Sequence, residues 1–138
     1  MTPQLWVLVG AALAAPYLWV ALRPRLRKRL VASGLVIAAL IYVGFAAVGG
    51  APVSWLAIEL LGVGAYGLLA WLGWRVAPVW LAIGWGAHVF WDVAIHSHGT
   101  GASFTPHWYP PVCLGFDVAM AATLLVALRL RQPDGLSA

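Results

Sequence analysis

Long apolar stretches, broken by short polar or proline-containing segments, run through almost the whole chain. They cover about 5–22, 30–48, 53–74, 78–96 and 111–130. Each stretch is close to the ~20 residues that an α-helix needs to cross a hydrocarbon core of about 30 Å. Because lipid cannot satisfy the backbone groups of an open strand, the spans must be helices. The pattern therefore predicts an all-α transmembrane bundle of five spans.

The breaks between stretches contain residues that end helices. They are Pro24, the segment Gly49-Gly50-Ala51-Pro52, Pro78, and the pair Pro110-Pro111. Because the bundle uses nearly the whole length, we expect a single domain, residues 1–138. Glycines at 62, 64 and 67, with those at 84 and 86, predict a close approach of the third and fourth spans, since small residues let helices pack tightly.

The composition agrees with a polytopic membrane protein. Hydrophobic residues make up 63% of the chain and charged residues only 9%, whereas soluble domains carry about 25% charged residues. Cys113 is the only cysteine, which excludes an intrachain disulfide. The apolar N-terminal stretch has no basic segment before it, so we interpret it as a retained first span and not as a secretory signal.

The basic residues predict the orientation. Five of the eight lie in one short loop, namely Arg23, Arg25, Arg27, Lys28 and Arg29. If that loop is cytoplasmic, Arg75, Arg129 and Arg131 fall on the same side, and the loops 49–52 and 97–110, which lack Lys and Arg, fall outside. This predicts an N-terminus outside and a cytoplasmic C-terminus in the bacterial cytoplasmic (inner) membrane. Anionic lipid head groups, and not nucleic acid, are the expected partners of the basic loop.

Acidic and imidazole side chains gather in the outer half of the predicted bundle. Glu59 and Asp117 each lie six residues into a span from its outer end, or roughly 9 Å deep. Asp92 lies roughly 6 Å deep, while His88 is nearer the midplane. Three carboxyl groups from three spans are thus expected at one level, and such intramembrane groups are by default a functional-site hypothesis.

The spacing of these residues places them on common helix faces. His88, Asp92 and His96 are four residues apart and project from one face of the fourth span. Adjacent members could hold one ion, but all three could not, because His88 and His96 are about 12 Å apart along the axis. Cys113 and Asp117 are stacked in the same way on the last span.

A buried acid at the centre of a span costs about 2.5–3.5 kcal/mol on insertion scales. No Lys or Arg is expected at this depth, so a shared proton, a histidine or a bound cation must offset the cost. We predict a divalent metal, zinc or iron, with Asp92, His96 and Asp117 as ligands. Further candidate ligands are His88, His98, His107 and Cys113. Glu59, His88 and His107 are candidate acid/base groups.

Each of these residues also has a structural interpretation. Glu59 can serve as a hydrogen-bond donor between helices, and His88 can bind a backbone carbonyl. His96 and His98 can be solvated at the helix end, and His107, which precedes Trp108 and Tyr109, can belong to the interfacial belt. Cys113 can be a small buried apolar residue.

The segment His88-x3-Asp92-x3-His96, followed by His107-Trp108-Tyr109-Pro110 and Cys113-x3-Asp117, resembles a family of small bacterial multi-span proteins of unassigned function. The resemblance covers roughly the C-terminal third of the chain. It implies a membrane protein with a site in this region, and it implies no reaction.

Three functions are compatible with these patterns. The first is a metal-binding membrane protein that acts on a lipid-like substrate from the outer side. The second is a structural or assembly subunit of a membrane complex, with the acids joining helices. The third is a proton- or cation-coupled permease subunit. A second copy of the chain is a candidate partner in each case, and the sequence does not decide whether the protein is an enzyme.

Overall fold

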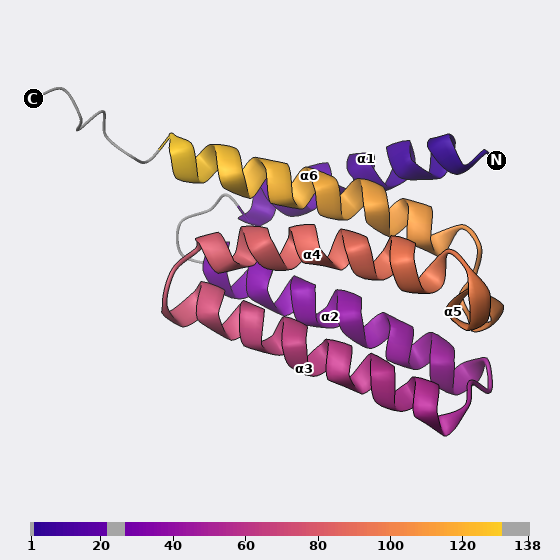
Figure 1. Ribbon diagram of the computed structural model, residues 1–138. Coiled ribbons are helices and arrows are strands. Elements are labelled where there is room, and N and C mark those ends of the chain that lie inside the picture. Colours follow the sequence, from indigo (N-terminus) through magenta and orange to yellow (C-terminus); the bar gives the residue numbers. More distant parts are fainter. Residues whose placement is uncertain (1, 22–26, 131–138) are drawn as a thin grey trace, which may run out of the picture.

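The computed structural model describes residues 2–21 and 27–130, which form an all-α bundle (Figure 1). The helices are α1 (Pro3–Ala21), α2 (Arg27–Val48), α3 (Val53–Arg75), α4 (Val79–His96), α5 (Gly99–Phe104) and α6 (Tyr109–Arg129). The five long helices occupy the five predicted stretches. Arg23, Arg25 and Arg131 lie outside the described residues, as does the side chain of Arg27.

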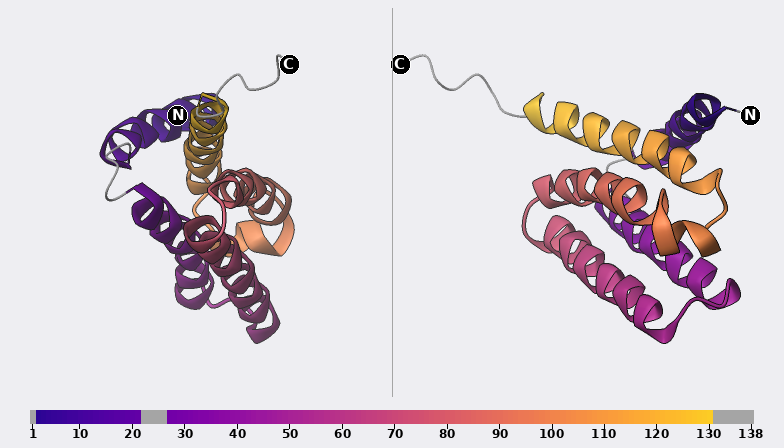
Figure 2. Two further views of the ribbon diagram at one scale, coloured as in Figure 1. Left: turned by 90° about the vertical axis from the view of Figure 1, so that its left-hand side faces the viewer. Right: turned by 45° about the vertical axis from the view of Figure 1, so that its right-hand side comes forward.

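Helix α4 is the central element of the bundle. It packs against α6 on one side and against α2 and α3 on the other (Figures 1 and 2). Helix α1 contacts the bundle mainly through α6, with a further hydrogen bond from the Tyr17 hydroxyl to the Leu30 carbonyl of α2. Every long helix except α1 therefore contacts α4 directly.

Helices α1 and α6 approach each other closely at two glycines. A Cβ added at Gly10 would lie 1.9 Å from the carbonyl oxygen of Val112, and one added at Gly115 would lie 1.9 Å from that of Val7. No side chain fits at either place, because the obstructing atom belongs to the partner backbone. The two glycines thus set the distance between these helices.

The exterior is apolar, unlike that of a soluble bundle, and part of the interior is polar. Large apolar side chains are exposed on the outside, for example Leu8, Leu61 and Phe90, which are 64%, 74% and 75% exposed. In the interior, Glu59, His88, Asp92, His96 and Asp117 are all buried. A surface of this kind is stable against hydrocarbon and unfavourable against water.

Four helices of the described chain are long and apolar enough to cross a membrane, namely α1, α2, α3 and α6. Helix α4 is not among them. It has 18 residues, and His88, Asp92 and His96 reduce its apolar character. The chain is therefore an all-α protein with four membrane-spanning candidates.

The basic side chains of the described residues lie at one end of the bundle. Lys28 and Arg29 begin α2, while Arg75 and Arg129 end α3 and α6 (left in Figure 1). We call this the basic end. The α2–α3 turn and α5 lie at the opposite end. We call it the outer end, after the orientation predicted from the sequence.

The segment 97–110, expected to be a loop, contains the short helix α5. Phe104 explains why it folds back onto the bundle: this ring is buried and packs edge-on against Trp55 and His96, with ring centroids 5.9 and 6.2 Å apart. Gly99, the first residue of α5, has a φ of 64°, a conformation that glycine adopts without strain.

Candidate metal centre

One face of α4 carries the polar side chains into the bundle. His88, Asp92 and His96 follow one another at intervals of four residues, so they share that face, and all three are buried. The expected common face is thus observed. Because α4 is the central helix, the three side chains meet groups from α2, α3 and α6.

The inner cluster consists of His88, Asp92 and Asp117. His88 Nδ1 lies 2.8 Å from Asp117 Oδ2 and 3.3 Å from Asp92 Oδ1. One ligand atom from each of the three residues lies within 4.8 Å of the others, and the three are the group among the described residues that could hold a metal ion. Tyr42 of α2 donates a hydrogen bond to Asp92 Oδ1 at 2.7 Å.

The outer cluster joins α3 to α4. His96 Nε2 lies 2.9 Å from Glu59 Oε1, and the indole N–H of Trp91 donates to Glu59 Oε2 at 3.3 Å. Both carboxylate oxygens of Glu59 therefore have partners. The Tyr42 ring stacks on the His96 ring with centroids 3.6 Å apart, so Tyr42 contacts both clusters.

The inner cluster holds two carboxylates and one imidazole, and no Lys or Arg is among its described partners. Asp92 and Asp117 come from different helices and are 0% and 1% exposed. Among the side chains that the structure describes, no Lys or Arg forms an ion pair with either of them. Two carboxylates this close repel each other unless a proton or a cation lies between them.

Two atoms of the inner cluster lack a hydrogen-bond partner within residues 2–21 and 27–130. They are His88 Nε2 and Asp92 Oδ2, both fully buried. A buried polar atom without a partner costs free energy, about 1–3 kcal/mol for an uncharged group and more for a charged one. The unpartnered carboxylate oxygen is thus a donor atom with capacity for a ligand.

The remaining candidate residues lie elsewhere. His98 and His107 are exposed and line, with His96 and Thr105, a cavity of about 390 Å³ at the outer end. Cys113 is buried one turn before Asp117 and outside the group of three. The structure therefore brings Asp92 and Asp117 together with His88, while His96 lies with Glu59.

A second cavity, of about 280 Å³, reaches the inner cluster from the side. Its walls come from α1, α2, α4 and α6, and they are almost wholly apolar. Cys113 and Asp117 lie in its wall beside Tyr109 and Phe116. Among the described residues, Asp117 supplies the only charged side chain that lines this cavity.

Tyr42, which contacts both clusters, is the candidate site residue that the sequence analysis did not single out. A tyrosine in an apolar stretch is usually an ordinary packing residue. One signal was nevertheless present: Tyr42 lies six residues from the outer end of its helix, which is roughly the 9 Å depth expected for Glu59 and Asp117.

Comparisons of the chain with protein-family models, with curated proteins and with solved structures gave no match.

Proposed function

We propose that this chain is a five-span protein of the bacterial cytoplasmic membrane that binds a divalent metal ion, zinc or iron, at His88, Asp92 and Asp117. The observation that carries the proposal is the inner cluster itself. An imidazole and two carboxylates from two helices are buried within 4.8 Å of one another, and no described Lys or Arg pairs with the carboxylates.

The distances support one shared ion. For metal–ligand bonds of about 2.0–2.1 Å, the ligands of a tetrahedral site lie roughly 3.3 Å apart. The separation of 3.3 Å from His88 Nδ1 to Asp92 Oδ1 is of this size, whereas the 2.8 Å from His88 Nδ1 to Asp117 Oδ2 is that of a direct hydrogen bond, which a bound ion would replace. A site with three protein ligands would keep a coordination position for water or a substrate, and a metal there supplies Lewis acidity.

Helix α4 is proposed as the fifth span. Its 18 residues are about 27 Å long, close to the thickness of a hydrocarbon core. Its outward face is apolar, with Ile83, Phe90 and Val93 exposed. The basic end then faces the cytoplasm, and the N-terminus and α5 face outward.

The apolar side cavity supports a lipid-like substrate. Three of the four helices that line it, α1, α2 and α6, are long and apolar enough to cross a membrane, and Asp117 of the proposed metal site lies in its wall. A membrane amphiphile could thus enter from the bilayer with its polar group toward the metal.

Photoaffinity labelling with a diazirine-bearing lipid tests this cavity. The extent of labelling should decrease in Ala38→Phe, whose new side chain fills the cavity, and should be unchanged in Ala47→Phe, which lies on the exposed surface of α2.

Elemental analysis of detergent-purified protein tests the metal site. We expect about one equivalent of a transition metal per chain in the native protein and in His98→Ala, which alters an exposed histidine outside the cluster. Asp117→Asn should lose the metal. A native protein that neither retains nor takes up zinc or iron would refute the proposal, as would full occupancy in Asp117→Asn.

The assembly subunit is the second candidate, and the outer cluster favours it. Glu59, His96 and Trp91 form a satisfied hydrogen-bond network between α3 and α4, as expected of groups that join helices. If this were the function of the inner cluster too, Asp92→Asn would lower stability in a protein that holds no metal.

A permease has less support. From His88 toward the basic end, the core consists of apolar side chains, including Leu81, Trp85, Met120 and Leu124. Such a layer closes the polar site on that side, because ions and protons need polar steps to cross it.

A further inference from the structure

A groove of about 350 Å³ lies between α2 and α3 at the basic end. Its walls are small or apolar, with Ala32 and Val36 on α2 and Gly67 and Ala70 on α3. Its polar lining is supplied by Arg29, Ser33, Trp71 and Trp74. The groove is thus apolar along its length and basic where α2 begins.

Two guanidinium groups lie close to one indole ring at this groove. The central carbon of Arg29 is 5.5 Å from the Trp74 ring centroid, and that of Arg75 is 5.2 Å from the same centroid. Contact with an aromatic face favours each cation, but two like charges beside one ring also repel each other. An anion between them would remove that repulsion.

The described part of the chain supplies no such anion. Its three carboxylates, Glu59, Asp92 and Asp117, are buried in the two polar clusters. The fourth acidic residue, Asp134, lies outside the described residues. Among the described side chains, neither Arg29 nor Arg75 forms an ion pair.

We propose that this groove binds one anionic glycerophospholipid, with its phosphate between Arg29 and Arg75 and an acyl chain along Gly67 and Ala70. The charge of the lipid complements the two arginines, and anionic lipids are attracted to such basic segments. Trp71 and Trp74, both partly exposed, suit the boundary between head group and hydrocarbon. The proposal is independent of the metal site.

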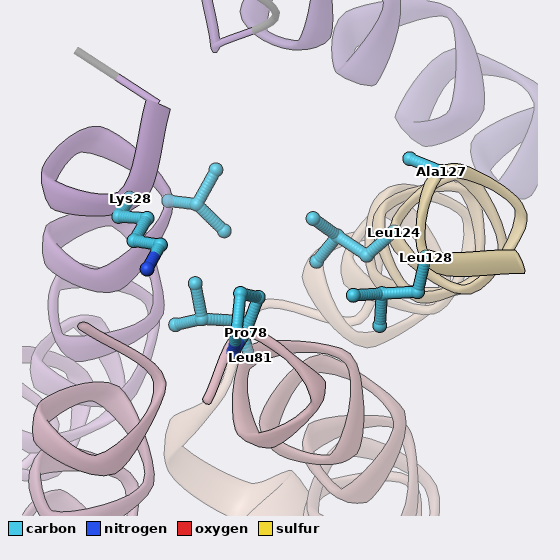
Figure 3. A pocket seen from close by; sticks show the side chains of 7 residues that line it. Lys28, Pro78, Leu81, Leu124, Ala127 and Leu128 are labelled. Atoms are coloured by element: carbon cyan, nitrogen blue, oxygen red, sulfur yellow. The ribbon is translucent and has the colours of Figure 1, made fainter. Parts of the chain in front are cut away.

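Lys28 provides a matched control, because its side chain lies at a different place. Figure 3 shows it at a small cavity of about 30 Å³ between α2, α4 and α6, with Pro78, Leu81, Leu124 and Leu128. A cavity of that volume holds about one or two waters and no acyl chain. Lys28→Gln therefore removes the same charge as Arg29→Gln at nearly the same height in the bundle, outside the groove.

Native mass spectrometry of detergent-purified protein with bound phosphatidylglycerol tests whether the site requires a negatively charged lipid. We expect one tightly retained lipid per chain, with phosphatidylcholine retained far less. Arg29→Gln should weaken phosphatidylglycerol binding about fivefold, as expected for the loss of one basic side chain near an anionic head group. Lys28→Gln removes a charge of the basic loop outside the groove and should weaken binding by less than about twofold. Equal losses in the two variants, or equal retention of the two lipids, would overturn the proposal.

A pair of glycine variants tests whether an acyl chain lies in the groove. A Cβ at either Gly64 or Gly67 meets nothing within 4 Å, so both positions have room for a larger side chain, but only Gly67 lines the groove. Gly67→Leu should expel the lipid, and Gly64→Leu should not. Retained binding in Gly67→Leu, or displacement of the lipid by inorganic phosphate at millimolar concentration, would mean that an anion alone is recognised and would refute the lipid site.

Discussion

At the scale of single residues, Tyr42 connects the two polar clusters of the interior. Its hydroxyl donates to Asp92 Oδ1 at 2.7 Å, and its ring stacks on His96. A hydrogen bond to a carboxylate that holds a metal fixes the orientation of that ligand, and losing such a bond typically weakens metal binding 10–100-fold. Tyr42 is therefore the positioning residue of the proposed metal site.

Tyr42→Phe should reduce metal affinity by about 10–100-fold while keeping the ring stack on His96. Competition with a chelator of known affinity measures the change. Tyr66→Phe is the matched control, because the Tyr66 hydroxyl donates to the backbone carbonyl of Ala87 at 3.2 Å and not to a site carboxylate. Equal affinities in Tyr42→Phe and native protein would contradict this role.

The Glu59–His96 pair should contribute to stability and not to metal binding. Glu59→Leu and His96→Leu each leave one buried partner unpaired, which costs about 1–3 kcal/mol. The double variant should cost less than the sum, with an interaction free energy of about 0.5–3 kcal/mol. Unfolding in mixed detergent micelles measures the cycle, and elemental analysis should find unchanged metal content. A metal lost from either single variant would mean that the outer cluster belongs to the site.

At the scale of helices, the presence of several glycines in two helices does not by itself bring those helices close together. Of the glycines expected to bring α3 and α4 together, Gly62 meets Trp91 of α4, but Gly64 and Gly67 face open space. The closest backbone approach is instead that of α1 and α6, at Gly10 and Gly115. A glycine permits a close approach, and the arrangement of helices decides where one occurs.

Gly10→Ala should destabilise the protein by about 1–3 kcal/mol, because the new methyl group collides with the backbone of Val112 and forces α1 away from α6. Thermal unfolding in detergent gives the change. Gly44→Ala is the control: nothing lies within 4 Å of its added Cβ, so it should be neutral or stabilising by up to about 1 kcal/mol. A Gly10→Ala variant as stable as Gly44→Ala would show that α1 does not pack tightly.

At the scale of the whole molecule, the bundle has an apolar exterior, a polar interior near one end and basic residues at the other. That asymmetry makes the topology testable, because a five-span chain must place the two ends of α4 on opposite sides of the membrane. The native Cys113 is buried, so it gives little background for thiol labelling.

An impermeant thiol reagent added to intact cells should label Ser103→Cys, in the exposed part of α5 at the outer end. Val76→Cys, exposed at the turn between α3 and α4, should be labelled only after the cells are opened. Labelling of both positions in intact cells would mean that α4 does not cross the membrane, and the reverse pattern would invert the orientation.

The hydrophobic pattern alone predicted the all-α class and the ends of the long helices. The physical reason is that lipid admits few backbone structures, so a run of about 20 apolar residues has essentially one fold. Helical periodicity also predicted that His88, Asp92 and His96 share a face. The helix α5 was missed because its burial depends on Phe104 meeting Trp55, a contact between segments distant in sequence.

The tertiary structure decided which polar side chains pair with each other in the inner and outer clusters. The helical rise per residue predicted that Glu59, Asp92 and Asp117 lie at one depth. The rotation of α3 and α6 about their axes, however, pairs Glu59 with His96 and Asp117 with His88. That rotation depends on how whole helices pack, for example on the close contact between the backbones of α6 and α1 at Gly10 and Gly115. Sequence determines how deep each polar group lies, whereas packing determines which groups touch.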